Sequence, residues 1–183
     1  NVSVGQFGNT ISGAYYKQLC NISPFPGEYY LFDEESFARA ILVDGEAKVI
    51  AKLLRDNSCQ FRASRAHFEQ SGRGNNWALG YYGRGGADGL VLVEKTMESL
   101  RTELEKCDVY RGCMILHSLC GGTGSGLGSR LLEEIRDEIG TRSYLISTTV
   151  LPFSMGELPL QNYNAALCLS RVVLRLNLHL HHL

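Results

Sequence analysis

The sequence has little net charge and no long apolar run. Its 183 residues carry 18 Lys plus Arg and 19 Asp plus Glu, so no excess of positive charge is present to hold the phosphates of a nucleic acid. No stretch approaches the roughly 20 apolar residues that span a bilayer, and the first residues lack the basic and apolar parts of a signal peptide. These absences predict a soluble, intracellular protein without a nucleic-acid or membrane partner.

Paired cysteines are also missing. The six cysteines, at positions 20, 59, 107, 113, 120 and 168, show no C-x-x-C spacing, which argues against a structural zinc site or a compact disulfide scaffold. We expect free thiols that are mostly buried. The histidines near the end, His179, His181 and His182, have no carboxylates beside them, and we assign no metal site to them.

Predicted strands and helices alternate along the chain. The 44% hydrophobic content and the length predict one domain. Apolar runs predict strands over residues 2–4, 39–43, 113–116 and 144–151; three- and four-residue spacing predicts helices over 11–19, 90–107 and 127–139, with Gly140 as a stop. Glycine-rich residues 72–89 predict a long ordered loop rather than a helix. The alternation predicts an α/β fold with a mostly parallel sheet and helices on both faces. Because the first strand has no beginning and no methionine precedes it, we expect the fold to be incomplete at both ends.

A run of glycine and hydroxyl residues follows the strand at 113–116. Residues 121–126 read Gly-Gly-Thr-Gly-Ser-Gly and lead directly into a helix. Glycines let backbone amides approach an anion, a helix start adds unpaired donors, and the hydroxyls of Thr123 and Ser125 are further donors. A di- or triphosphate fits this chemistry; the alternative is a purely structural turn. The run lacks the lysine of G-x-x-x-x-G-K-[ST], and Leu127 stands where G-x-G-x-x-G needs its third glycine.

Acidic residues follow another predicted strand. Asp44 and Glu46 come after the apolar run at 39–43. The carboxyl end of a buried parallel strand faces the ligand crevice in folds of this class, so these carboxylates are candidates for a ligand or metal site. The alternative is a solvated strand end.

Two kinds of side chain favour a structural role over a functional one. His117 stands on a strand before the glycine run, and we expect a hydrogen-bonded core histidine rather than a proton shuttle. Trp77, Tyr81 and Tyr82 are predicted to anchor their loop rather than to stack on bases, because no basic field accompanies them.

Several segments in order resemble the tubulin superfamily. Residues 121–126 match its glycine-rich signature, and residues 5–9, 42–49, 72–78 and 158–167 resemble its first nucleotide loop, acidic loop, γ-phosphate loop and ribose segment. The resemblance runs from Val4 to about Ser170 and is most like zeta-tubulin, with delta-tubulin second. It implies a Rossmann-like three-layer GTPase domain. Four positions depart from the usual pattern: Phe7 replaces cysteine, Thr10 replaces glutamine, Ala47 replaces proline and Gln161 replaces glutamate.

The resemblance implies GTP or GDP with Mg²⁺ as the bound ligand. Glu46, and Asp44 through water, would serve the magnesium, since a hard cation prefers oxygen ligands. Asn75 would lie near the terminal phosphate and Gln161 near the ribose. The remaining implied nucleotide contacts are Gln6, Phe7, Ser118, Gly121, Gly122, Thr123 and Gly124.

The same resemblance implies a cytoskeletal role. Implied partners are other tubulin-family subunits or microtubule and centriole components, with a location in the cytoplasm and cytoskeleton at the centriole or basal body. The catalytic acid for hydrolysis would come from a neighbouring subunit, and the asparagines that recognise guanine lie beyond this sequence.

Two alternatives to this function stay open. The chain could be a metabolic enzyme that binds a dinucleotide, or an inert truncated product.

We divide the chain into a partial nucleotide-binding domain, residues 1–170, and a divergent tail, residues 171–183, which would be an edge strand or an unrelated segment.

Overall fold

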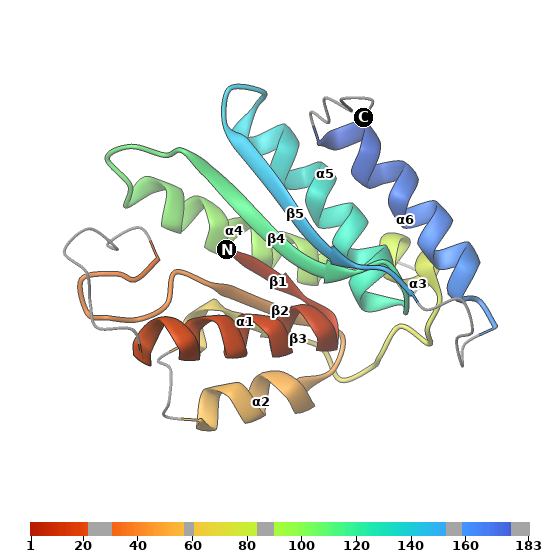
Figure 1. The fold of residues 1–183 in the computed structure, drawn as a ribbon, viewed down its shortest axis with the longest axis horizontal. Helices are drawn as coiled ribbons and strands as arrows, with labels where there is room; N and C mark the ends of the chain where they lie inside the picture. Colours follow the sequence, from red (N-terminus) through yellow and green to blue (C-terminus); the bar gives the residue numbers. More distant parts are fainter. Residues whose placement is uncertain (22–30, 57–60, 84–89, 153–158, 177–183) are drawn as a thin grey trace.

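The chain folds into one parallel sheet with helices on both faces. The structure is a computed structural model that describes residues 1–21, 31–56, 61–83, 90–152 and 159–176 (Figure 1). The strands are β1 (Val2–Val4), β2 (Ile41–Asp44), β3 (Ala66–Phe68), β4 (Gly112–Ser118) and β5 (Tyr144–Val150). They lie in the order β3-β2-β1-β4-β5, and each neighbouring pair is parallel. The α/β fold predicted from the sequence is confirmed.

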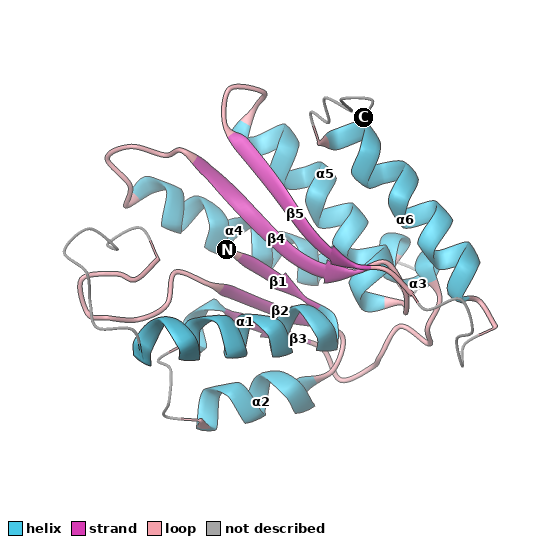
Figure 2. Cartoon of the chain, in the orientation of Figure 1, coloured by secondary structure: helices cyan, strands magenta, loops and turns pink. Residues whose placement is uncertain are grey.

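Helices connect the consecutive parallel strands. They are α1 (Gly5–Asn21), α2 (Ala47–Arg55), α3 (Trp77–Tyr82), α4 (Val91–Glu105), α5 (Gly128–Ile139) and α6 (Gln161–Arg175). A 3₁₀ turn η1 (Ala63–Arg65) precedes β3, and a π-helical segment η3 (Thr123–Leu127) precedes α5. Figure 2 shows α1 and α2 on one face of the sheet, with α4 and α5 on the other. α6 packs beside α5, outside the three layers.

Each sheet face has its own apolar core because strand side chains alternate between faces. In β2, Ile41 and Val43 join the larger core under α4 and α5. Leu42, between them, joins the smaller core around Tyr16 of α1 and Ile50 of α2. The continuous apolar run therefore belongs to a strand covered on both faces, as the sequence indicated.

Two glycine-containing segments are helical where the sequence predicted loops. α1 begins directly at Gly5, whose φ is +75°, so no separate turn separates it from β1. α3 lies inside the stretch predicted as a loop; Asn76 caps it by accepting hydrogen bonds from Ala78 N at 2.9 Å and Leu79 N at 3.4 Å. Residues 84–89 of that stretch lie outside the described residues.

The helix α6 crosses the boundary expected at residue 170. It runs without interruption through position 170 to Arg175, so residues 171–175 are helical and not an edge strand. The tail beyond 176, with its three histidines, lies outside the described residues. The backbone therefore continues in one element across the division expected at residue 170.

The cysteines differ from their predicted burial. Cys113 and Cys168 are buried, Cys107 and Cys120 are partly exposed, and Cys20 is exposed. All five are free thiols, as predicted, but most are not buried. Cys59 lies outside the described residues.

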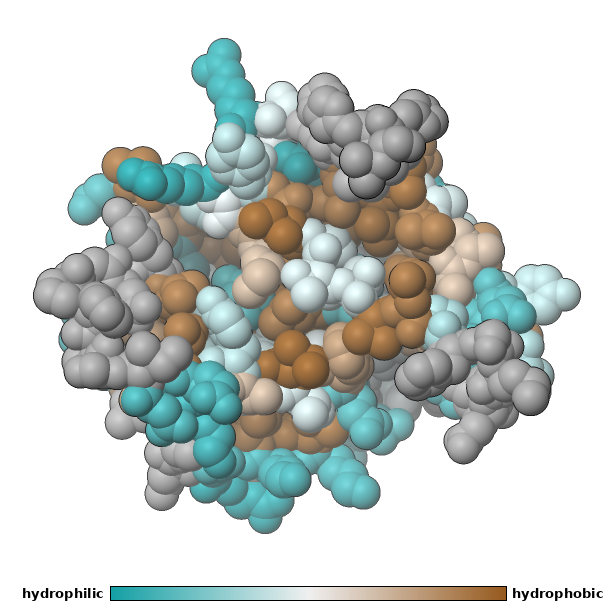
Figure 3. Space-filling view, in the orientation of Figure 1, coloured by the Kyte–Doolittle hydropathy of each residue, from teal (hydrophilic) through white to brown (hydrophobic). Residues whose placement is uncertain are grey.

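One side of the sheet beyond β4 carries exposed apolar side chains. Tyr144, Ile146 and Val150 of β5 point away from the face that α5 covers and are exposed. α6 adds Tyr163 and Leu174 on its outer surface. Figure 3 shows apolar surface in the part of the molecule where Figure 1 places β5 and α6. Among the helices that the structure describes, none has the length and apolarity needed to cross a bilayer.

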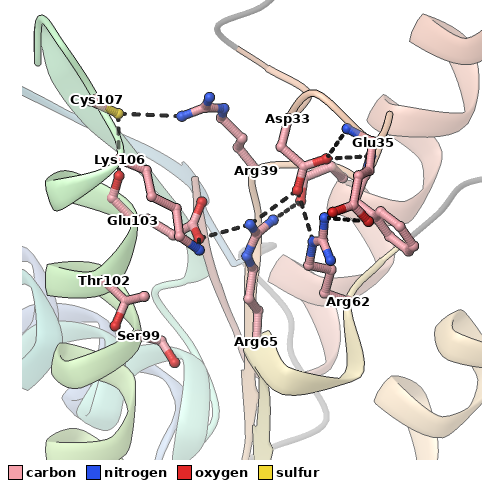
Figure 4. A network of polar contacts seen from close by, with 12 residues as sticks. Asp33, Glu35, Arg39, Arg62, Arg65, Ser99, Thr102, Glu103, Lys106 and Cys107 are labelled. Carbon is pink, nitrogen blue, oxygen red and sulfur yellow. Dashed lines mark hydrogen bonds and ion pairs between the residues drawn. The ribbon is translucent and has the colours of Figure 1, made fainter.

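A charged network lies at the amino ends of strands β2 and β3. Arg65, just before β3, contacts Asp33 at 3.1 Å and Glu103 of α4 at 2.7 Å (Figure 4). Arg62 also contacts Asp33, at 2.8 Å. Because these carboxylates and guanidinium groups are paired within the fold, the network joins α4 to the segment that precedes β2.

Candidate nucleotide-binding site

The candidate site lies where the strand order reverses. The chain leaves β1 for β2 and β3 on one side, and then crosses to β4 and β5 on the other side. In open parallel sheets, ligands bind in the crevice beyond the carboxyl ends of the strands at such a switch point. Here α1 starts beyond β1 and the glycine run starts beyond β4, so the two sequence-predicted loops meet at this point.

Contacts at the glycines show how closely these segments approach one another. A Cβ atom on Gly5 would lie 3.0 Å from Gly124 N, and one on Gly45 would lie 3.1 Å from Thr123 Oγ1. A Cβ on Gly122 would lie only 2.5 Å from Arg73 O. Side chains are therefore excluded where the segments after β1, β2, β3 and β4 pack against one another at this switch point.

Part of the glycine run is free to present its backbone. Gly121 has a φ of +79°, and its missing Cβ would meet only Asn75 Oδ1, at 3.7 Å. Gly126 N donates to Gly122 O at 2.9 Å, which begins the helical hydrogen bonding that α5 continues. Positive-φ backbone followed by a helix start is an arrangement that binds anions.

Two hydroxyls near the run face the fold. Ser125 is fully buried and donates to Gly121 O, so it does not serve as the predicted donor to an anion in this structure. Ser118 Oγ donates to Cys120 O at 2.6 Å. Thr123 lies against Gly45, and its role as a donor to an anion stays a prediction.

His117 of β4 hydrogen-bonds to the glycine run. Its ring is fully buried, with Nδ1 at 3.1 Å from Gly124 O and Nε2 at 2.9 Å from Ser147 Oγ. Since a carbonyl oxygen only accepts, Nδ1 carries the proton and Nε2 accepts from Ser147. Burial lowers the pKa of His117 to about 4. The predicted hydrogen-bonded core histidine is confirmed.

The acidic pair predicted for magnesium divides into a buried and an exposed carboxylate. Asp44 is 5% exposed, and burial raises its pKa to about 6, although the amides of Glu46 and Gly45 and the side chain of Asn9 oppose the shift. Glu46 is exposed at the start of α2, and its Oε1 would collide with a Cβ at Gly72.

Asn9, which sequence reasoning did not single out, completes this corner. Its Nδ2 donates to Val43 O at 2.9 Å and lies 3.5 Å from Asp44 Oδ2. Its Oδ1 is buried and has no hydrogen-bond partner within the described residues. Carboxylate and amide oxygens next to a phosphate crevice fit Mg²⁺, which takes one or two protein ligands and completes its shell with phosphate and water. The described residues hold no cluster of three or more His, Cys, Asp or Glu that could bind a metal.

Comparison with known proteins identifies the family. The Tubulin/FtsZ family GTPase domain matches residues 1–180. The chain belongs to the tubulin/FtsZ family. It is 34% identical over 194 residues to a tubulin delta chain of Canis lupus familiaris, covering 93% of this chain and 42% of that protein.

Other tubulins give similar agreement. A tubulin beta-1 chain of Glycine max is 31% identical, covering 94% of this chain and 42% of its own length. A tubulin delta chain of Homo sapiens is 36% identical, and the match covers 79% of this chain and 32% of that protein. The chain thus spans about two fifths or less of the tubulins it matches. These relatives include delta and beta chains, and the zeta-type resemblance stays a prediction.

Several predicted tubulin contacts meet in the crevice. Gly121, Gly122, Thr123 and Gly124 lie together, with Asn75 facing Gly121. Ser118 lies beneath Gly124, where a Cβ would collide with its hydroxyl. Their roles toward a nucleotide stay predictions.

The other predicted nucleotide contacts lie at helix starts. Gln6 is exposed and Phe7 partly exposed in the first turn of α1, next to Gly5. Gln161 is mostly buried and is the first residue of α6. The placement of Phe7 and Gln161 toward a nucleotide rests on the tubulin resemblance.

Sequence reasoning missed two further residues at this tubulin-type site. Arg73 is nearly fully buried beside Gly122, and its Nη2 lies 2.8 Å from Glu69 Oε2. Asn164 of α6 hydrogen-bonds to the backbone of both Asn75 and Trp77. The match to the γ-phosphate and ribose segments was the available signal, but it does not reveal which side chains join those segments.

Proposed function

We propose that this chain binds GTP and GDP with Mg²⁺ in the crevice beyond β1 and β4, as the nucleotide-binding part of a cytoskeletal tubulin-family protein. The observation that carries the proposal is the close approach of Gly5 and Gly45 to the glycine run, where side chains are excluded, next to Gly121, whose positive-φ backbone faces Asn75. Membership of a GTPase-domain family supports the choice of guanine nucleotide over other phosphate ligands.

Each part of the nucleotide has a proposed partner. Backbone groups of Gly121, Gly122, Thr123 and Gly124 hold the phosphates, assisted by Gln6, Phe7 and Ser118. Asn75 lies at the terminal phosphate, and Gln161 lies at the ribose. Asp44 and Glu46 hold Mg²⁺ directly or through water, with Asn9 Oδ1 as the additional oxygen.

The cellular role follows from the family. We infer assembly with other tubulin-family subunits, with nucleotide acting as a conformational ligand. The acid that completes hydrolysis comes from a neighbouring subunit, so this chain alone has negligible turnover. Association with the centriole or basal body, in the cytoplasm and cytoskeleton, is the finer expectation from the zeta- and delta-like sequence.

Thermal unfolding with different nucleotides tests the proposal. The purified chain is melted with Mg²⁺ and GTP, GDP, ATP, NAD or no ligand. A ligand that binds only the folded state at 100 times its Kd adds about 2.7 kcal/mol to the free energy of unfolding. For a chain of this length that corresponds to a rise in Tm of roughly 5–10 °C. We expect this rise with GTP and GDP only.

A pair of glycine variants separates binding from backbone strain. Gly121 and Gly140 both have positive φ, +79° and +68°, and neither missing Cβ meets a close neighbour. Alanine therefore causes similar strain at both positions, but only Gly121→Ala places a methyl group in the crevice. We expect Gly121→Ala to abolish the shift with GTP and Gly140→Ala to keep it. A shift with NAD alone would assign the crevice to a dinucleotide, and a cooperative melt indifferent to every nucleotide would overturn the proposal.

A further inference from the structure

The loop that carries Asn75 has an unusual backbone. Gly74 and Asn75 have φ values of +54° and +50°, so two successive residues adopt the left-handed region. Asn75 is not a glycine, and a side chain in this region is uncommon without a surrounding structure that holds it. The loop is short, because β3 ends at Phe68 and α3 begins at Trp77.

Asn164 holds this loop from the neighbouring helix. Its Oδ1 accepts a hydrogen bond from Trp77 N at 2.9 Å, and its Nδ2 donates to Asn75 O at 2.7 Å. The side chain is only 2% exposed, so water does not compete for either bond. Both ends of the amide are therefore used to fix the backbone on either side of Asn76.

The opposite side of the loop is held differently. Arg73 lies against Gly122 and pairs with Glu69, so the beginning of the loop is anchored to the end of β3. Between these two anchors, Asn75 Oδ1 faces Gly121. Loss of the Asn164 anchor would free the second half of the loop while leaving the glycine run in place.

We propose that Asn164 is a positioning residue that lets the site distinguish nucleoside triphosphate from diphosphate. The inference rests on the proposed function, in which Asn75 lies at the terminal phosphate. Asn164 does not touch the nucleotide; it fixes the carbonyl of Asn75 and the amide of Trp77, and thereby the direction of the Asn75 side chain. A diphosphate does not reach Asn75, so its affinity is independent of the anchor.

The test compares the affinity of each variant for a slowly hydrolysed GTP analogue and for GDP, both with Mg²⁺. We expect Asn164→Ala to weaken triphosphate binding by roughly tenfold, the effect of one lost well-placed polar contact, and to change GDP affinity by less than about twofold. The ratio of the two affinities is the decisive measurement. A partly unfolded variant weakens both ligands by the same factor, so instability alone leaves the ratio unchanged.

Two controls match the substitution. Asn162→Ala removes the same side chain from an exposed position of the same helix. Ser129→Ala removes another buried partner of Trp77, the hydroxyl 3.2 Å from its Nε1, without touching the loop backbone. Both should keep the wild-type ratio. Hydrogen exchange provides a second readout, and we expect the amides of residues 75–77 to exchange faster in Asn164→Ala only.

The outcomes separate this inference from the proposed function. A wild-type chain that binds neither nucleotide would overturn the function itself. A wild-type chain that binds both, with an unchanged ratio in Asn164→Ala, would overturn the positioning role and leave the function standing. A changed ratio in Ser129→Ala as well would show that general packing around Trp77, and not Asn164, sets the discrimination.

Discussion

The two ends of the sheet differ in how their buried polar groups are paired. At the amino ends of β2 and β3, Arg65 is buried between Asp33 and Glu103, and these charges are paired, although Glu103 Oε2 is buried without a hydrogen-bond partner in the described residues (Figure 4). At the carboxyl ends, glycines expose the backbone, and Asn9 Oδ1 is buried without a partner. Buried charges that pair with one another are accounted for by the fold itself. A buried polar atom without a partner needs an explanation, and beside the glycine run a bound cation is the explanation that fits the proposed function.

The two ends also differ in the pKa shifts of their aspartates, Asp33 and Asp44, which have opposite directions. Burial alone would raise the pKa of Asp33, but hydrogen bonds from Arg62 and Phe37 N, with the charges of Arg62 and Arg65, lower it below its usual value. Asp44 has no cation beside it in the described part of the chain, and burial raises its pKa to about 6. The missing positive charge is the one that Mg²⁺ would supply in the proposed site.

The largest expected effect comes from breaking the paired end. Arg65→Ala leaves Asp33 and Glu103 partly buried without their shared cation and also removes the donor to Ala38 O. We expect the free energy of unfolding to fall by about 3–5 kcal/mol, because acceptors on Asp33, Glu103 and Ala38 lose the buried guanidinium together, although Arg62 still pairs with Asp33 and Lys106 with Glu103. Urea denaturation measures the loss. A ratio of triphosphate to diphosphate affinity that changes in this variant would contradict the separation of the two ends.

The second prediction concerns Asp44 and its pH dependence. Because its folded-state pKa lies above the ordinary aspartate pKa of 3.8, the folded state binds more protons between pH 3.8 and about 6. Stability therefore falls as pH rises through this window, and the penalty is fully present at pH 7. Asp44→Asn should stabilise the nucleotide-free chain at pH 7 by about 2–3 kcal/mol and remove this pH dependence.

The matched variant is Asp33→Asn, in which the sign reverses. The lowered pKa of Asp33 contributes stability that is present above its unfolded pKa and is lost as pH falls through its folded pKa. We therefore expect Asp33→Asn to destabilise the chain at pH 7. Unfolding curves between pH 3 and 8 compare the two variants, and a shift of the same sign in both would remove the contrast between the ends.

A smaller effect is expected at the cap of α3. Asn76→Ala removes the acceptor for Ala78 N and Leu79 N and should cost about 1 kcal/mol, whereas Asn76→Ser keeps a capping oxygen and should cost less. Denaturant titration measures both. Equal losses in the two variants would mean that the cap does not stabilise this helix.

The smallest effect is expected at an exposed ion pair. Arg101 contacts Glu138 at 2.8 Å between α4 and α5, but the Arg101 side chain is about half exposed. We expect Arg101→Ala to change the free energy of unfolding by less than about 1 kcal/mol, since solvent and salt screen such pairs. A loss in urea denaturation as large as that of Arg65→Ala would show that burial does not govern the value of these pairs.

The sequence predicted elements whose signals are local. The strands β1, β2, β4 and β5 follow from apolar runs, and the glycine run at 121–126 stands out by composition. α3 was missed because glycines dominate its surroundings, whereas its stability depends on the Asn76 cap and on the stacking of Trp77 against Tyr81, with ring centroids 4.5 Å apart.

The missed site residues depend on distant pairings. Asn164 bonds to a residue 89 positions earlier in the chain, and Arg73 lies against Gly122, which belongs to another loop. Spacing along one sequence carries no information about such contacts. Asn9 stood within a predicted loop, but its role emerged only when α1 began at Gly5 and directed the side chain toward β2.

The buried imidazole of His117 makes the shape of the glycine run independent of pH. Its pKa of about 4 keeps the ring uncharged throughout the physiological range, so the bonds to Gly124 and Ser147 do not change with mild acidification. Asp44 takes up its proton at a higher pH, near 6. On acidification the proposed cation corner would therefore be neutralised first, while the backbone cradle beneath the phosphates is still intact.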